Sequence, residues 1–328
     1  MRYILRRIGF FLGTLWAALT LNFVLPRIMP GNPTIDMLAR FRQHNITPAT
    51  LKALAIAFGV NDHEGLVASY FHYLGACLTL HFGTSLTDFP DPVSQVVMQA
   101  LPYTLGLVGL TTVLSFVLGT VVGIAGAWRR GSWMDNVLPP VFVIASAFPY
   151  YFVGMLSLLL FSFTLHWLPF SGGYSIQDSP AWSWSFIWDI LQHAFLPALT
   201  ILVTSIGGWI LTMRNTMVTV LAEDYVRMAR AKGLSPSRIM FDYAGRNAIL
   251  PNLTGFAMSL GFVVSGAILV EYVFNYPGVG YILLQATQNE DFPLMQALFL
   301  LITMAVLVAV LIADFATAWL DPRTRATA

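Results

Sequence analysis

Charge and cysteine are scarce in this chain of 328 residues. Asp, Glu, Lys and Arg make up 10% of it, whereas soluble domains carry about 25%. Hydrophobic residues make up 57%, and the mean hydropathy is +0.70. One cysteine, Cys77, excludes an intrachain disulfide framework. A net charge of +1 gives no indication of a nucleic-acid partner. The composition therefore predicts a membrane protein.

Catalytic and nucleotide-binding motifs are also missing from the sequence. It has no G-x-x-x-x-G-K-[ST] loop to hold phosphates, and neither the H-E-x-x-H nor the G-x-S-x-G pattern of hydrolases. The six histidines lack the tight spacing of metal ligands. We therefore expect no catalytic site, no metal site and no cofactor on this chain, which argues against a membrane-embedded hydrolase.

Six apolar runs are long enough to cross a bilayer, which takes about 20 helical residues. They cover residues 8–28, 101–128, 137–165, 194–213, 253–271 and 295–318. The sequence thus predicts an all-α polytopic membrane protein with six transmembrane helices. Three prolines, Pro139, Pro140 and Pro149, are expected to kink or delay the third span. A shorter apolar stretch at 70–82 should lie at the membrane surface or within an outer domain.

Lysine and arginine are distributed unevenly between the connections. Most of the 17 basic residues lie near the two termini, at 129–130, or between 214 and 246. Because cytoplasmic connections carry the excess of these residues, both termini are predicted to be cytoplasmic. The chain then divides into a tail and first span (1–30), an outer insertion (31–100) and a core of five spans (101–328), which includes a cytoplasmic loop at 214–250.

The densest charge lies in EDYVRMARAKGLSPSRI, residues 223–239, between two apolar runs. Its first part predicts a short amphipathic helix, with Tyr225, Met228 and Ala229 on one face and Arg227 and Arg230 on the other. Such a helix fits either an ordinary basic loop on lipid headgroups or a docking surface for a partner protein.

The ends of this helix are also marked in the sequence. Gly233 is expected to end it in the left-handed conformation, and Ser235 and Pro236 to start the next helix as N-cap and N1. Glu223 and Arg227 are spaced to form an i, i+4 ion pair. The result is a helix, a sharp turn and a second helix leading into the fifth span.

The small residues of the spans have two interpretations, and two outer acids have one. Gly119 and Gly123, like Gly261 and Ser265, allow close helix approach, either at a dimer seam or, as we favour, within the bundle. Glu290 and Asp291 are expected to form a solvated face.

Several fragments carry a family resemblance. EDYVRMARAKGLSPSRIMFDYAGRNAILPNLTGF resembles the coupling motif, or EAA loop, of bacterial ABC-importer permeases, although Arg227, Met228 and Ala229 stand where the general pattern has Glu-Ala-Ala. In the same chain order, YILRRIGFFLGTLW, HFGTSLTDFPDPVSQVVMQALPYTLGL, LHWLPFSGGY, VEYVFNYPGVGYILLQATQNEDFPLMQA and LDPRTR resemble the oligopeptide/dipeptide branch. Together they are similar to the B-type permease of the peptide/nickel importer family, over nearly the whole chain.

The resemblance implies a type I ABC importer permease fold in the bacterial cytoplasmic (inner) membrane. It implies a heterodimer with a second, homologous permease, an extracytoplasmic substrate-binding protein, and ATPase subunits, two separate or one fused, that bind ATP and Mg. The implied cargo is di- or oligopeptides, with a metal, glutathione or another small solute as alternatives. The competing class is an ion-coupled secondary transporter, which favours paired intramembrane charges and inverted repeats, and neither is evident.

The resemblance also implies roles for particular residues. Contact with the ATPase would come from Glu223, Asp224, Tyr225, Val226, Arg227, Met228, Ala229, Arg230, Ala231, Lys232, Gly233 and Leu234. The translocation path would draw on Ser146, Ser157, Thr200, Thr204, Ser205, Asn252, Thr254, Ser259 and Ser265, unless their side chains bond only within the bundle. Glu271 would act at an outer gate, contact the binding protein, or cap a helix.

Overall fold

The structure is a computed structural model that describes residues 2–28, 65–175, 182–265 and 267–320. Within these ranges the chain is helical, with one isolated β-bridge between Thr84 and Pro92. About half of the expected outer insertion, residues 31–64, lies outside the described residues. The described remainder of that insertion contains one helix and a loop that leads into the second span.

The described helices lie in the following order along the chain. The first half contains α1 (Arg2–Ile28), α4 (Leu66–Thr79), α5 (Val93–Thr104), α6 (Leu110–Trp128), α7 (Trp133–Asn136), α8 (Leu138–Ala147) and α9 (Tyr150–Ser157). The second half contains α10 (Trp184–Val220), α11 (Asp224–Ala231), α12 (Pro236–Arg238), α13 (Arg246–Ala248), α14 (Leu250–Phe262), α15 (Ile268–Val273), α16 (Val279–Gln288) and α17 (Phe292–Leu320). Wider π-helical turns join several of them: η1 (Leu105–Gly109), η2 (Leu158–Thr164) and η3 (Ile239–Gly245).

The described helices give fewer straight spans than the six predicted. Four are long and apolar enough to cross a membrane: Arg7–Leu25, Val93–Trp128, Trp184–Val220 and Phe292–Ile312. A fifth can be formed by Trp133–Ala147 and Tyr150–Thr164, which meet at 97°. The polytopic all-α class is therefore supported, whereas the count of six spans and the membrane sides of the termini stay predictions.

Two predicted spans differ from the structure for identifiable reasons. The run 137–165 bends where Phe148 is extended (φ −81°, ψ 137°) and Pro149 precedes α9, because a residue before proline avoids the helical conformation. The run 253–271 is divided between α14, with 13 residues, and α15, with 6. The first break confirms the kink expected at Pro149, whereas the second break was not predicted from the sequence.

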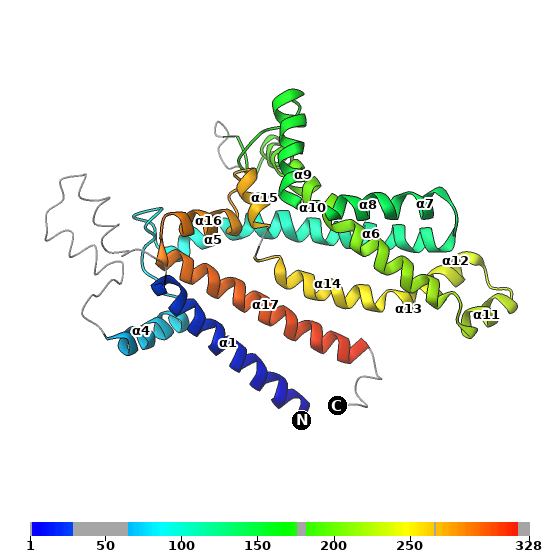
Figure 1. Cartoon of the computed structure of the whole chain (residues 1–328), viewed down its shortest axis with the longest axis horizontal. Coiled ribbons are helices and arrows are strands. Elements are labelled where there is room, and N and C mark those ends of the chain that lie inside the picture. The colour runs from blue at the N-terminus through cyan, green and yellow to red at the C-terminus, as the bar shows by residue number, and fades with distance from the viewer. Residues whose placement is uncertain (1, 29–64, 176–181, 266, 321–328) are drawn as a thin grey trace.

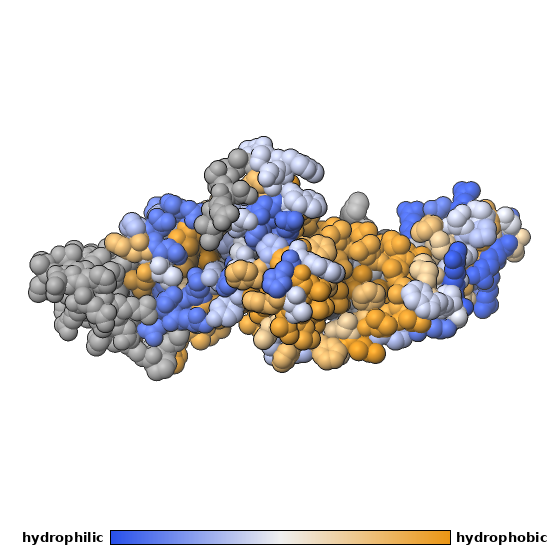
Figure 2. Space-filling view, turned by 90° about the horizontal axis from the view of Figure 1, so that it is seen from above, coloured by the Kyte–Doolittle hydropathy of each residue, from blue (hydrophilic) through white to orange (hydrophobic). Residues whose placement is uncertain are grey.

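The molecule is elongated, with an apolar middle between polar ends. Figure 1 places α11 and α12 at one end and α4, α5 and α16 toward the other. Figure 2 shows hydrophobic residues gathered between hydrophilic ends, one of which carries α11 and α12. Helices α1 and α17 run alongside each other in opposite directions (Figure 1), and Asn22 of α1 donates to the Gln296 carbonyl at 3.0 Å. This distribution fits a bilayer crossing the middle of the molecule.

Glycines bring α6 and α10 into close contact. A Cβ on Gly119 would lie 2.5 Å from the Trp209 Cβ, and one on Gly123 would lie 2.8 Å from the Ile210 carbonyl oxygen. Neither position leaves room for a side chain without moving α10, so the two glycines pack within the bundle, as favoured from the sequence. Gly261 of α14 meets Ala309 of α17 in the same way.

Candidate functional site

Helix α11 is held to its own chain by two apolar side chains. Val226 is 0% and Ala229 2% exposed. Both lie in a cluster with Met213 and Met217 of α10 and Ala244 of the η3 turn. Burying a valine side chain stabilises by about 1.5–3 kcal/mol, so this contact fixes an eight-residue helix that is too short to be stable alone.

The outward face of α11 differs from the face predicted. Ala229, expected beside Tyr225 and Met228 as a docking contact, is buried against its own chain instead. Met228 is 59% exposed, whereas Tyr225 lies on the flank, where its hydroxyl accepts a hydrogen bond from Asn247 Nδ2 at 3.0 Å. The ATPase contacts predicted for Ala229 and Val226 were wrong, because a helical wheel cannot tell which apolar residues meet the parent chain.

We define the outward face of α11 as Asp224, Arg227, Met228 and Ala231, which are all exposed. Arg227 Nη1 lies 3.6 Å from Asp224 Oδ1, and the two side chains are 70% and 95% exposed. This i, i+3 pair replaces the expected pair of Arg227 with Glu223. Exposed pairs contribute about 0–1 kcal/mol, so these charges remain available to a partner.

The carboxyl end of α11 confirms the role predicted for Gly233, whose φ is +74°. The Gly233 amide donates to the Arg230 carbonyl at 2.9 Å, and the Leu234 amide donates to the Ala229 carbonyl at 3.3 Å. These two bonds form the Schellman motif, in which the residue after the cap is left-handed. The chain therefore reverses sharply on a residue that tolerates this conformation.

The segment after the turn starts as predicted. Ser235 is extended (φ −61°, ψ 144°) and Pro236 opens α12, although the serine side chain makes no capping hydrogen bond. The helix continues through η3 and α13, and Pro251 then lies in the first turn of α14. Movement of α11 is thus connected to α10 before it and to α14 after it.

An ion pair ties the α6–α7 turn to α10. Arg214 Nε lies 2.5 Å from Asp135 Oδ1, and Asp135 is 7% exposed. The other oxygen of Asp135 accepts from the Gly131 amide at 2.9 Å. Breaking a buried pair is strongly destabilising because it leaves a charge without a partner. Sequence reasoning missed this pair, since its members lie 79 residues apart.

The residues expected along the translocation path mostly bond their own helices. The hydroxyls of seven donate to backbone carbonyls three or four residues earlier: Ser146, Ser157, Thr200, Thr204, Thr254, Ser259 and Ser265. Ser205 shares a 2.8 Å hydrogen bond with Ser115 of α6. Thr200 and Asn252 are 0% and 1% exposed within this chain alone, so in this conformation they line no open surface. For the other seven path residues, the role stays a prediction.

Glu271 is fully buried, which overturns its predicted contact with a binding protein. Its Oε2 accepts from the amides of Gly280 (2.7 Å) and Tyr281 (3.2 Å) at the start of α16, and its Oε1 accepts from the Thr104 hydroxyl at 2.8 Å. Thr104 in turn accepts from the Val279 amide at 2.7 Å. The carboxylate therefore caps α16, the alternative that the sequence left open.

Glycines make room for this carboxylate. A Cβ on Gly278 would collide with Glu271 and with Thr104, and one on Gly280 would lie 2.7 Å from Ile268 Cα. The signal in the sequence is therefore the pair Gly278 and Gly280 in the PGVG segment, which leaves room for the nearby carboxylate of Glu271.

Asp291 is also fully buried, so its prediction as a solvated residue was wrong. Its Oδ2 accepts from the Ser85 hydroxyl (2.6 Å) and from the amides of Leu86 (2.7 Å) and Thr87 (2.9 Å). Its Oδ1 accepts from the Leu294 amide at 3.1 Å, in the first turn of α17. One carboxylate thus caps α17 and holds the loop before α5.

Comparison with known proteins places this arrangement in a family. Residues 115–326 match the family described as binding-protein-dependent transport system inner membrane component. The chain belongs to this family. It is accordingly a multi-pass protein of the bacterial inner membrane and a permease component of a transport system.

Relatives of known name match along almost their full length. A putative peptide permease protein of Brucella suis is 34% identical, covering 100% of both chains. The dipeptide transport system permease protein of Lactococcus lactis is 30% identical, covering 99% of both. The oligopeptide transport system permease protein of Bacillus subtilis is 30% identical, covering 98% of both. These matches confirm the resemblance stated from the sequence fragments.

Proposed function

We propose that this chain is the channel-forming subunit of an ATP-driven peptide importer, and that α11 transmits movement from cytoplasmic ATPase subunits to the membrane helices. The observation that carries the proposal is the division of α11 into two faces. Val226 and Ala229 hold it to the bundle, while Arg227 and Met228 are presented outward. An exposed apolar side chain rimmed by charges is typical of a protein-docking surface.

The connections of α11 support a mechanical role. It follows α10 directly and is linked through the Gly233 turn and η3 to α14. A push on its outward face would therefore reach two membrane helices at once. ATP-dependent closure of the partner would bias the bundle between inward-facing and outward-facing states, as a ligand biases a two-state element.

The remaining subunits follow from the permease role. A second, homologous permease would pair with this chain to enclose the path, and an extracytoplasmic binding protein would deliver the cargo. ATP and Mg would be held by the ATPase partners, two separate or one fused, because this sequence has no phosphate-binding loop. We assign no catalytic role to this chain.

Peptides are the proposed cargo because the relatives reported above carry peptide, dipeptide and oligopeptide transport in their names. The test is ATP-dependent uptake by the complete complex in proteoliposomes, across a panel from dipeptides to decapeptides, with glutathione and nickel as competing cargoes. Saturable uptake of one peptide class supports the proposal. Uptake that continues without ATP and follows an ion gradient would refute it.

The coupling role has its own test. Met228→Asp should leave membrane insertion intact and abolish substrate-stimulated ATP hydrolysis, because it places a charge in the docking contact. Met228→Leu, which keeps the contact apolar, should retain most of the stimulation. Gly233→Pro should also uncouple the complex, because proline cannot adopt a φ of +74°. Normal coupling in the Met228→Asp complex would overturn the docking assignment.

A further inference from the structure

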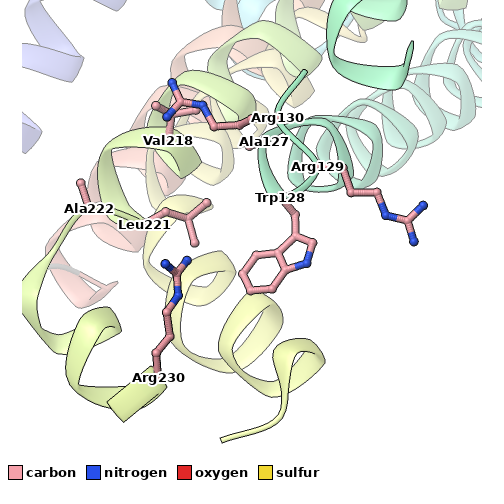
Figure 3. A pocket seen from close by; sticks show the side chains of 8 residues that line it. All are labelled: Ala127, Trp128, Arg129, Arg130, Val218, Leu221, Ala222 and Arg230. Atoms are coloured by element: carbon pink, nitrogen blue, oxygen red, sulfur yellow. The ribbon is translucent and has the colours of Figure 1, made fainter. Parts of the chain in front are cut away.

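A basic hollow lies beside α11, apart from its outward face. It has a volume of about 440 Å³ and opens between the end of α6 and the turn from α10 to α11. The end of α6 contributes Trp128, Arg129 and Arg130 to the lining, and the α10–α11 segment contributes Val218, Leu221 and Arg230. Figure 3 shows the side chains of Trp128 and Arg230 facing each other across this space, whereas Arg129 extends away from it.

The hollow lies where two apolar spans end. One span is Val93–Trp128 and the other is Trp184–Val220. Tryptophan is enriched at the boundary between hydrocarbon and headgroups, and arginine side chains near span ends extend toward that boundary. These two residue types favour a place for the hollow at the depth of lipid phosphates, in the leaflet at the α11 end of the molecule.

The arginines around the hollow are not neutralised by described carboxylates. No ion pair joins Arg129, Arg130 or Arg230 to an acidic residue in the part of the chain that the structure describes. Arg230 instead lies over the Trp128 ring, 5.9 Å from its centroid. Asp135 acts on Arg130 at longer range, but its carboxylate is already bound by Arg214.

The hollow combines charge with an apolar wall. Val218 and Leu221 offer contact to an acyl chain, and the guanidinium groups of Arg130 and Arg230 offer several donors to phosphate oxygens. A free phosphate ion would use only the charged part of this lining. A phospholipid would use both parts, and it would enter from the bilayer.

We propose that this hollow binds the phosphate-bearing headgroup of an anionic phospholipid. Arg230 belongs to α11, whereas Arg130 follows α6, so the bound headgroup links the two elements and holds α11 in place. This inference does not rest on the proposed transport function, because binding can be measured on the isolated chain.

The experiment is native mass spectrometry of the full chain in detergent. Phosphatidylglycerol is added to one sample, and phosphatidylcholine with the same acyl chains is added to another. Phosphatidylglycerol should bind more tightly. The double variant Arg130→Gln/Arg230→Gln should weaken that binding about thirtyfold, because each arginine near an anionic headgroup contributes about 1 kcal/mol. The control Arg238→Gln/Arg246→Gln removes the same charge outside the hollow and should change binding less than about threefold.

Each outcome decides for or against the proposal. Equal affinity for the two lipids, or equal loss in the two double variants, would overturn it. Displacement of phosphatidylglycerol by millimolar inorganic phosphate would overturn the lipid assignment in favour of a free anion. The double variant Arg130→Lys/Arg230→Lys keeps both charges but removes the bidentate geometry of the guanidinium groups. Partial retention of phosphatidylglycerol binding in this variant supports the guanidinium contact. It also shows that the loss of binding in the glutamine variant is not caused by a loss of folding.

Discussion

The outward face of α11 and the opposite end of the molecule use charged residues in opposite ways. At the α11 end, Asp224 and Arg227 are exposed, and the helix is held from beneath by the apolar Val226. At the far end, Glu271 and Asp291 are fully buried, and backbone amides occupy their carboxylates. The first arrangement presents charge to a partner, whereas the second uses charge to fix loops of the same chain.

Whether a charged side chain is exposed or already hydrogen-bonded therefore distinguishes binding residues from structural ones, even where both are carboxylates. A carboxylate whose oxygens already accept two or three hydrogen bonds has little left to offer a partner. A helix fixed by buried apolar contacts can leave its polar groups free. Substitutions at the buried carboxylates should therefore change stability, and substitutions on the outward face of α11 should change coupling.

The largest expected loss of stability follows Val226→Asp. The substitution places a carboxylate at a 0% exposed position in an apolar cluster. We expect a loss of about 4 kcal/mol in the free energy of unfolding, because the buried charge has no partner. Chemical denaturation of the purified protein in detergent measures this loss. A loss below about 1 kcal/mol would show that α11 is not seated on the bundle.

Glu271→Ala should have the next largest effect. It leaves the amides of Gly280 and Tyr281 and the hydroxyl of Thr104 without this acceptor. We expect a loss of about 3 kcal/mol in the free energy of unfolding. The control is Glu290→Gln, at a partly exposed position on the same side, which should change stability by less than about 0.5 kcal/mol. Equal effects of the two substitutions would contradict the capping role.

Gly119→Ala should have a smaller effect, confined to the contact of α6 with α10. The added Cβ would meet the Trp209 Cβ at 2.5 Å, and overpacking of this kind costs about 1–3 kcal/mol. The matched control is Gly208→Ala in α10, where a Cβ meets nothing within 4 Å. Alanine should be neutral or slightly stabilising there, because it favours helix more than glycine does. Equal destabilisation by both would refute the close approach.

The sequence predicted those features that depend on nearby residues. Apolar runs located α1, α10 and α17, and Gly233 marked the end of α11 because a left-handed residue is required within that single turn. These features need no knowledge of the rest of the chain.

Features that depend on distant residues were missed. Thr104 and Glu271 are 167 residues apart, and Ser85 and Asp291 are 206 apart. Asp291 directly precedes Phe292 and Pro293, which is typical of an N-cap, but nothing near it in the sequence indicates the contact with Ser85 that buries it. Likewise, helical periodicity grouped Ala229 with Met228, but the position of the η3 turn decides that Ala229 is buried.

Site-specific photocrosslinking of the assembled complex tests most directly the claim that the outward face of α11 meets the ATPase. A photoreactive phenylalanine derivative would replace Met228, 59% exposed on α11, or Phe71, 64% exposed on α4. Neither change should alter stability by more than about 0.5 kcal/mol. The account predicts a crosslink to an ATPase subunit from position 228 and none from position 71. Crosslinks from position 228 only to lipid or to this chain itself would contradict it.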